Sequence, residues 1–254
     1  MINDEVKQET TTNEYFKKYA SIIGCLLWIS RTTRPDIAPS VGFLTRFQSK
    51  PNKRHWKAAI NVLKYLKCTK TISLTYSKDL SLYKNDFMFI EYASNPKILN
   101  IYCDASYAND LDDRKSTTGF LIYYLGCLIL WGSKKQSHVA KSTMQAEYHA
   151  LGYTTDEIRK VRGILNSIGF SQETSIVHED STSAIFSAEN KVLNSTTRAF
   201  EIQYHSIREA ISNKEIKLVL TATKQMIADF MTKILETSLF RQLRAKVLNL
   251  KGAK

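Results

Sequence analysis

The chain has 254 residues, of which 36 are Lys or Arg and 24 are Asp or Glu, giving a net charge of +12, and 43% are hydrophobic. These values exclude an intrinsically disordered chain and a low-complexity fibre, because the apolar fraction is large enough to form a buried core. The length fits one large domain or two small ones.

No segment has the character of a membrane span. The longest apolar run, residues 120–132, is interrupted by a Leu125-Gly126 turn and is shorter than the roughly 20 residues that a bilayer requires. The first 16 residues are polar and acidic and do not resemble a secretion signal. The four cysteines form no CxxC pair, which argues against a zinc site or a disulfide framework. We therefore expect an intracellular protein, cytoplasmic or nuclear, without a membrane partner.

Most of the excess positive charge lies in one stretch. Between Arg31 and Lys78 there are eleven basic residues and a single acid, Asp36. Aromatic side chains are interleaved with the basic ones in residues 54–65, a mixture that suits a surface contacting phosphates and bases. The candidates for nucleic-acid contact in this stretch are Arg54, His55, Trp56, Lys57 and Lys64. The alternative is a solvated helix face whose aromatic residues belong to the core.

The first 70 or so residues have a helical pattern. Apolar spacing predicts helices over 15–30, from Pro35 through Phe47, and over 55–66. Residues 78–96 have no clear period and are expected to form a connector, so the predicted domains are 1–92 and 97–254.

After the connector the pattern changes to strands. Alternation predicts a strand ending at Asp104 and a hairpin made of 120–124 and 127–131. A long helix over 142–168, a strand over 176–180, a short helix over 183–189, a strand over 216–221 and a final helix over 226–249 follow. This order predicts an α/β domain, a mixed sheet flanked by helices, preceded by the mainly helical N-terminal block.

Three acidic residues lie where a sheet enzyme would hold a metal ion. Asp104 is placed at the end of the first strand, and Glu147 borders the apolar stripe of the long helix. In the strand 176–180, Glu179 and Asp180 point to opposite faces, and Asp180 is preferred because it lies at the strand end. Carboxylates that converge in this way suit a pair of Mg²⁺ ions catalysing phosphodiester hydrolysis. Each acid has a structural alternative: a strand-end cap, a helix ion pair and a helix N-cap, respectively.

Several motifs in one order resemble the C-terminal region of copia-type retrotransposon Pol polyproteins. They are TRPDI at 33–37, HWKAA at 55–59, LKYL at 63–66, CDASYA at 103–108, DRKSTTG at 113–119, SKKQ at 133–136, AEY at 146–148, YHSIRE at 204–209 and ADFMTK at 228–233. The resemblance covers nearly the whole chain from about Tyr15. It implies that 1–92 is the thumb and connection region of a reverse transcriptase and that the rest is a ribonuclease H-like domain.

The resemblance also implies an activity and its partners. The chain lacks the Tyr-x-Asp-Asp motif of a polymerase palm, so the implied activity is hydrolysis of the RNA strand of RNA–DNA hybrids. The implied metal ligands are Asp104, Glu147 and Asp180, with two Mg²⁺ ions that Mn²⁺ can replace. The rest of a Pol polyprotein or a reverse transcriptase is a further implied partner.

The chain departs from the family pattern at several positions. The fourth family carboxylate, an Asp, corresponds to Glu201, which is one methylene longer and is expected to assist as a metal ligand at reduced rate. Asn194 and Ala199 replace two histidines, Ser181 replaces an Asn, and Lys160 replaces a Trp. These departures support an alternative, a catalytically decayed remnant that only binds nucleic acid.

A second group of basic and hydroxyl side chains brackets the predicted hairpin. Such residues can contact phosphates or 2′-hydroxyls along a hybrid duplex. The candidates are Arg114, Lys115, Ser116, Thr117, Lys134 and Lys135, with Ser133 beside them. A solvated hairpin edge guarded by lysines is the structural alternative. An integrase-like D-D-E site is rejected because the candidate Glu215 lies in a turn before a strand and no zinc module precedes it.

Overall fold

The computed structural model describes the backbone of residues 2–76, 97–190 and 201–250, and the side chains of these except 2–13 and 201–204. The chain divides into two compact units, residues 1–74 and 75–254. The predicted boundary between 92 and 97 falls on or beside residues outside the described ranges, so it stays a prediction.

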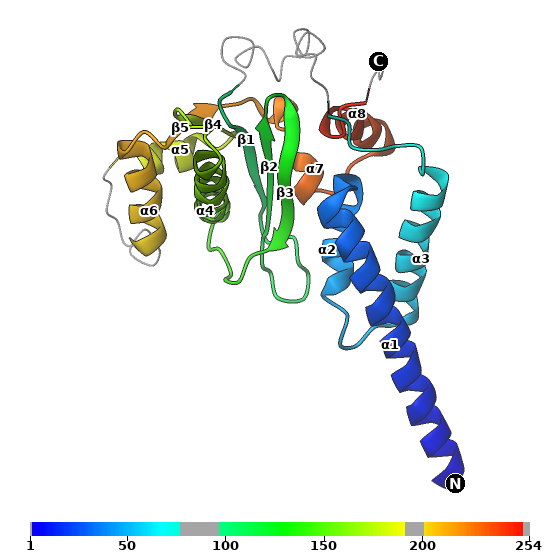
Figure 1. The fold of residues 1–254 in the computed structure, drawn as a ribbon. Helices are drawn as coiled ribbons and strands as arrows, with labels where there is room; N and C mark the ends of the chain where they lie inside the picture. The colour runs from blue at the N-terminus through cyan, green and yellow to red at the C-terminus, as the bar shows by residue number, and fades with distance from the viewer. Residues whose placement is uncertain (1, 77–96, 191–200, 251–254) are drawn as a thin grey trace. The chain divides into compact units, whose positions relative to one another are not determined.

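The first unit is helical, as expected (Figure 1). It contains α1 (Ile2–Thr32), a 3₁₀ turn η1 (Pro35–Ile37), α2 (Ala38–Thr45) and α3 (Lys53–Cys68). The three helices pack around Tyr19, Ile23 and Leu26, all fully buried.

The TRPD motif crosslinks this unit. Arg34 forms a salt bridge with Asp36 at 2.7 Å, and Tyr65 donates a hydrogen bond to the same carboxylate at 2.6 Å. Arg34 also donates to the Thr69 hydroxyl at 2.7 Å. Because Arg34 and Asp36 are 7% and 3% exposed, the pair ties the turn after α1 to the end of α3.

The second unit is built on a five-stranded sheet with the order β3-β2-β1-β4-β5. The strands are β1 (Asn100–Ser106), β2 (Thr117–Tyr124), β3 (Cys127–Lys135), β4 (Ser175–Glu179) and β5 (Ile216–Leu220). β1, β2 and β3 are antiparallel neighbours, whereas β4 is parallel to both β1 and β5. The predicted fold class, a mixed sheet flanked by helices and preceded by a helical block, is confirmed.

Helices cover both faces of this sheet (Figure 1). The long α4 (Thr143–Ser167) lies on one face, and the short α7 (Asp229–Thr232) lies on the other, over β1 and β2. The remaining helices are α5 (Thr182–Glu189), α6 (Glu201–Ser212) and α8 (Thr237–Val247), with a 3₁₀ turn η5 (Thr223–Gln225) after β5.

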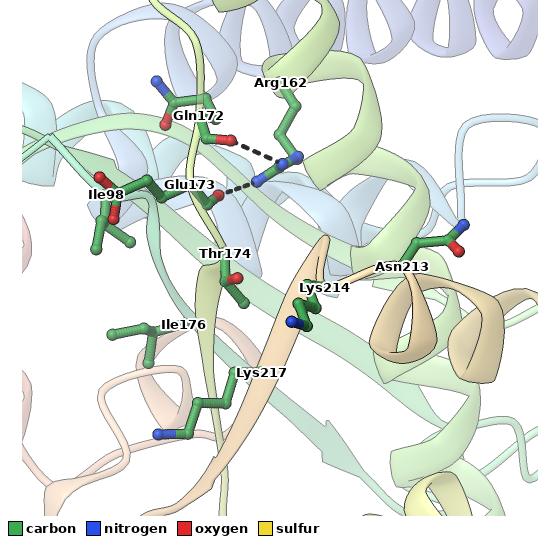
Figure 2. Close-up of a pocket in the computed structure, with 9 residues that line it drawn as sticks. All are labelled: Ile98, Arg162, Gln172, Glu173, Thr174, Ile176, Asn213, Lys214 and Lys217. Atoms are coloured by element: carbon green, nitrogen blue, oxygen red, sulfur yellow. Dashed lines mark hydrogen bonds between the residues drawn. The ribbon is translucent and has the colours of Figure 1, made fainter.

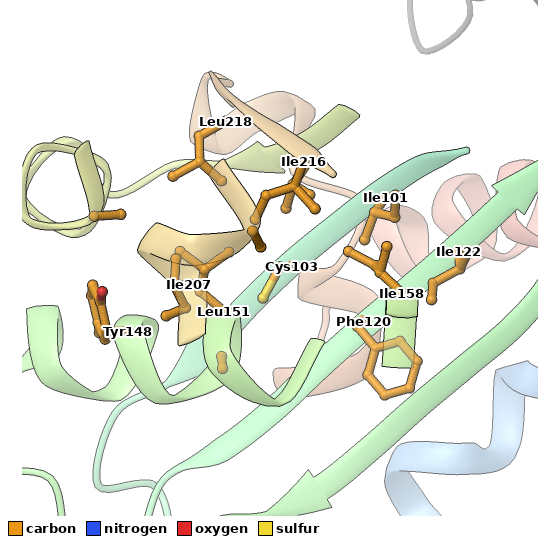
Figure 3. Packing of buried hydrophobic residues seen from close by; sticks show 14 of the residues in the cluster. Ile101, Cys103, Phe120, Ile122, Tyr148, Leu151, Ile158, Ile207, Ile216 and Leu218 are labelled. Carbon is orange, nitrogen blue, oxygen red and sulfur yellow. The ribbon is translucent and has the colours of Figure 1, made fainter. Parts of the chain in front are cut away.

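The core lies between the sheet and α4. Alternate residues of β1, including Ile101 and Cys103, meet Leu151 and Ile158 of α4 in a buried cluster (Figure 3). Strand alternation therefore sends Tyr102 and Asp104 to the opposite face, beneath α7.

Two expectations about the elements were wrong, and one helix was not foreseen. The predicted helix over 226–249 is broken, because α7 ends at Thr232 and α8 begins at Thr237. Helix α6 was not predicted, although its YHSIRE motif lies inside it. β1 continues for two residues beyond Asp104, since Ala105 and Ser106 still pair with Thr118 and Thr117.

Candidate metal centre

Three carboxylates predicted from the sequence lie together. One oxygen each of Asp104, Glu147 and Asp180 can be chosen such that all three lie within 4.8 Å of one another. Asp104 lies on β1, and Glu147 lies in the second turn of α4. Asp180 directly follows the last residue of β4. The parallel register of β1 and β4 brings the two aspartates to the same level on one face of the sheet.

The start of α4 is fixed by its cap. Ser142 is the N-cap residue, and its hydroxyl accepts a hydrogen bond from the Gln145 backbone N–H at 3.2 Å. The Gln145 side chain in turn accepts from the Lys141 N–H at 2.7 Å. These bonds set where α4 begins and so fix the position of Glu147 along the helix.

Burial and neighbouring negative charges raise the pKa of both Asp104 and Glu147. Asp104 is 1% exposed, and burial raises its pKa to about 6 although Lys233 and Thr232 act against the shift. Burial raises the pKa of Glu147 still more, with contributions from Glu179, Asp104 and Asp180. The free energy of this arrangement falls if a cation enters, because the carboxylates then gain an opposite charge.

The ADFMTK segment, residues 228–233, also reaches the site, although the sequence did not predict a role for it there. Thr232, the last residue of α7, donates a hydrogen bond to Oδ2 of Asp104. The Lys233 ammonium lies 3.5 Å from Oδ1 of Asp104 and 2.5 Å from Oδ1 of Asp229. Asp229, half-buried, has a pKa raised by burial and by Asp180. The ADFMTK motif therefore brings a fourth carboxylate and a cation to the cluster.

Gly119 explains why α7 can approach so closely. It pairs with Asp104 across the β1–β2 ladder. A Cβ built on Gly119 would lie 2.5 Å from Cγ2 of Thr232 and 2.7 Å from Cβ of Met231. A side chain at this position would push α7 away from Asp104. The close approach of α7 therefore requires a glycine at the end of the DRKSTTG motif.

Glu179 affects the site although it was not predicted to belong to it. As expected, Glu179 points to the face opposite Asp180, but this face is the core beneath α4, where its side chain is fully buried. Its Oε1 accepts from the Ser181 N–H at 3.2 Å, and burial raises the pKa of Glu179 well above its usual value. It is the charged group with the largest effect on Glu147. Only its alternation with Val177 on the core-facing side of β4 could have indicated this role.

The donor set suits a hard divalent cation. All the ligand atoms are carboxylate oxygens, which Mg²⁺ and Mn²⁺ prefer. Oε2 of Glu147 is buried and has no hydrogen-bond partner among the described residues, so it is available for a metal ion. Asp180 is oriented by Thr223, whose hydroxyl donates to Oδ2 at 2.9 Å.

The predicted fourth ligand, Glu201, begins α6, but its side chain lies outside the described residues. Asn194 and Ala199 also lie outside them. Ser181 is the N-cap residue of α5, where its hydroxyl accepts from the Ala184 N–H at 3.2 Å. Lys160 pairs with Glu157 at 2.8 Å on the surface of α4.

Several of the predicted hairpin contacts are occupied within the protein. Ser116 is buried and its hydroxyl accepts from the Ala108 N–H at 3.0 Å, and Thr117 donates to Asn109 at 2.9 Å. Lys135 pairs with Asp110 at 2.6 Å and Asp113 at 2.9 Å.

The other three basic residues of the hairpin differ in exposure. Lys115 lies 3.5 Å from Asp113. Arg114 and Lys134 are exposed, and the Lys134 ammonium lies 4.4 Å from the centre of the Tyr153 ring. A pocket of about 130 Å³ is lined by Lys134 and Lys135 together with His138 and His149.

The candidates in α3 fall into two groups. Arg54, Lys57 and Lys64 are exposed and remain available for contact with a polyanion. His55 is used in a capping box with Asn52 and stacks on Phe47 at 3.7 Å, and Trp56 packs against Tyr15.

A cavity of about 560 Å³ lies at the other end of the sheet (Figure 2). It is lined by Ile176 and Lys217 near the first residues of β4 and β5, whereas the carboxylates lie at the opposite strand ends. Arg162 closes one side by donating to the carbonyl oxygens of Gln172 and Glu173 at 3.0 and 2.5 Å. This cavity is separate from the carboxylate cluster.

No family model matches the chain. Among curated proteins, the chain is 36% identical over 222 residues, 87% of its length, to the retrovirus-related Pol polyprotein from transposon TNT 1-94 of Nicotiana tabacum. It is 29% identical over 231 residues to the corresponding polyprotein from transposon RE2 of Arabidopsis thaliana. The chain belongs to the family of copia-type retrotransposon Pol polyproteins. It spans only 16% and 15% of the length of these two relatives.

A shorter relative matches about half of the present chain. It is the secreted RxLR effector protein 161 of Plasmopara viticola, 37% identical over 139 residues, which are 55% of the present chain and 87% of that protein. Among solved structures, LC11-RNase H1 is 17% identical with a TM-score of 0.42, covering 54% of this chain and 93% of that one. The same enzyme solved in complex with an RNA/DNA hybrid gives 16% identity and a TM-score of 0.42, covering 53% and 93%.

Within the part of the chain that the structure describes, no helix is both long and apolar enough to cross a membrane.

Proposed function

We propose that this chain is a ribonuclease H that hydrolyses the RNA strand of RNA–DNA hybrids with two divalent metal ions. The observation that carries the proposal is the convergence of Asp104, Glu147 and Asp180 from β1, α4 and β4 within 4.8 Å. The similarity to retrovirus-related Pol polyproteins supports it, because the resemblance implies a ribonuclease H-like domain in this part of the chain. An intracellular place of action, in the cytoplasm or nucleus, is part of the proposal.

Four carboxylates are proposed to hold the ions, those of Asp104, Glu147, Asp180 and Asp229. Asp104, the most deeply buried, lies at the centre and is oriented by the Thr232 hydroxyl. Glu147 supplies a carboxylate oxygen that has no partner in the described part of the protein, and Asp180 is held by Thr223. We assign the fourth carboxylate to Asp229 in place of Glu201, because Asp229 is joined to Asp104 through Lys233.

Bound metal ions supply the activation of a water nucleophile and the stabilisation of the leaving oxygen. The protein contributes the fixed positions of the carboxylates and the low-dielectric core beneath Glu147. It also contributes the like-charge arrangement that makes divalent cations bind strongly.

Substrate contact is proposed along the exposed basic residues of each unit. In the second unit these are Arg114 and Lys134, which flank the hairpin. In the first unit they are Arg54, Lys57 and Lys64 of α3. Ser116, Thr117 and Lys135 are better explained as residues that shape the loop, since each already has a partner there. The rest of a Pol polyprotein is a proposed partner.

The experiment uses the full chain with labelled RNA–DNA hybrid, RNA duplex, DNA duplex and single-stranded RNA, each in Mg²⁺ and in Mn²⁺. We expect cleavage of the RNA strand of the hybrid alone. Glu147→Gln and Asp180→Asn abolish it, whereas Asp156→Asn, an exposed surface change on the same helix, does not. Cleavage of single-stranded RNA at the same rate would contradict the proposed substrate.

The alternative is a remnant that binds nucleic acid without cutting it. It is favoured by the loss of both family histidines, at Asn194 and Ala199. Tight hybrid binding without cleavage in either metal would support this second function.

A further inference from the structure

Lys233 occupies an unusual place for a cation in a proposed metal site. Its ammonium lies between two carboxylates, 2.5 Å from Oδ1 of Asp229 and 3.5 Å from Oδ1 of Asp104. Asp104 is 1% exposed, whereas the Lys233 side chain is 37% exposed. The ammonium thus reaches a buried carboxylate from the solvent side.

The local backbone fixes this position. Asp229 begins α7 and Lys233 follows its last residue, so the two side chains are four residues apart and face each other. The Lys233 N–H also donates to the Asp229 carbonyl at 3.0 Å, which closes the helical turn. Phe230 and Met231 are buried, and the lack of a side chain at Gly119 lets this turn rest on β2.

The electrostatic consequence depends on whether a divalent ion is bound. Four carboxyl groups in one cluster repel one another, and Lys233 offsets part of this repulsion at Asp104 and Asp229. A divalent ion that binds the same oxygens must either displace the ammonium or tolerate a like charge a few ångströms away. The ammonium can be displaced because the four-carbon stem of lysine is flexible and the side chain is partly exposed.

We propose that Lys233 is the resident counter-ion of this carboxylate cluster: its ammonium holds Asp104 and Asp229 together in the metal-free protein and leaves when a divalent cation binds. This inference rests on the proposed metal-dependent function and deepens it, because it makes Lys233 a competitor that sets the metal concentration the protein needs. Lys233 is thereby a positioning residue for two ligands, with no direct part in the hydrolytic step.

The test measures Mn²⁺ binding to the full chain by titration calorimetry, with Lys233→Gln, Lys233→Arg and the matched control Lys217→Gln. Lys217 is exposed on β5 at the opposite end of the sheet, so its variant changes the net charge equally. We expect Lys233→Gln to bind Mn²⁺ about tenfold more tightly, since a unit charge close to a divalent ion is removed. Lys233→Arg keeps the charge and is expected to stay within about threefold of the wild type, as is Lys217→Gln.

A second measurement follows unfolding without metal. Lys233→Gln should unfold at a lower temperature than Lys217→Gln in EDTA and at an equal or higher one in saturating Mn²⁺. Unchanged or weaker Mn²⁺ binding by Lys233→Gln would overturn the proposal, and so would an absence of binding by every variant. Tighter binding by Lys233→Gln supports it even if the wild type cuts no hybrid, in which case only the proposed activity fails.

Discussion

Replacing Asp104 by Asn should make the metal-free protein more stable while removing its activity. Burial raises the pKa of Asp104 from 3.8 to about 6, so ionising this carboxyl in the folded state costs free energy. This rise from 3.8 to about 6 corresponds to about 3 kcal/mol of stability that is present below pH 3.8 and lost as the pH rises through 6. Asn has the same shape, carries no charge and can still accept the Thr232 hydrogen bond.

At pH 8 in EDTA, we therefore expect Asp104→Asn to exceed the wild type by up to about 3 kcal/mol, or about 6–12 °C in melting temperature. The difference should shrink toward zero near pH 4, and Mn²⁺ should narrow it at pH 8 by stabilising only the wild type. Urea denaturation across this pH range, with the exposed-residue variant Asp112→Asn as control, measures it. The reasoning is refuted if Asp104→Asn is the less stable protein at pH 8, or if the difference does not change with pH.

Three further predictions concern other residues. Asp229→Asn should reduce hybrid cleavage at least about 100-fold, as loss of a metal ligand does, while Glu201→Gln stays within about threefold; the reverse order would restore Glu201 as the fourth ligand. Burial lowers the pKa of His178 from 6.5 to about 4, so stability is lost as the pH falls through this range. Between pH 6.5 and 5 the wild type should lose about 2 kcal/mol relative to His178→Gln in urea denaturation, and parallel curves would contradict this cause. Asp36→Asn should destabilise the first unit by about 3–5 kcal/mol, because Arg34 stays buried without its counter-charge; tryptophan fluorescence would show an unchanged transition if the pair were unimportant.

The sequence predicted the strands and the long helix because their apolar periodicity is strong. β1, the β2–β3 hairpin, α4 and β4 lie within a few residues of their expected ranges, apart from longer hairpin strands. The same periodicity failed after residue 226, where apolar residues continue at helical spacing but the chain breaks between α7 and α8. A break of this kind depends on the packing of Phe230 and Met231 against the sheet, which no local pattern records.

The site was predictable where each acid lay at a recognisable place in an element. Asp104, Glu147 and Asp180 follow from strand alternation and from the apolar stripe of α4. Asp229 and Lys233 reach the cluster only because α7 folds back over Gly119, a contact between residues more than 100 positions apart. The burial of Glu179 beneath Glu147 likewise depends on which helix covers that face of the sheet.

Cleavage of an RNA–DNA hybrid, with each strand labelled separately, tests the central claim most directly. The wild type and Asp112→Asn, incubated with Mg²⁺ or Mn²⁺ at low salt, should produce fragments of the RNA strand only, and Asp104→Asn should produce none while still binding the hybrid. If the wild type binds the hybrid but leaves both strands intact in both metals, the carboxylate cluster is not a working nuclease site and the account is contradicted.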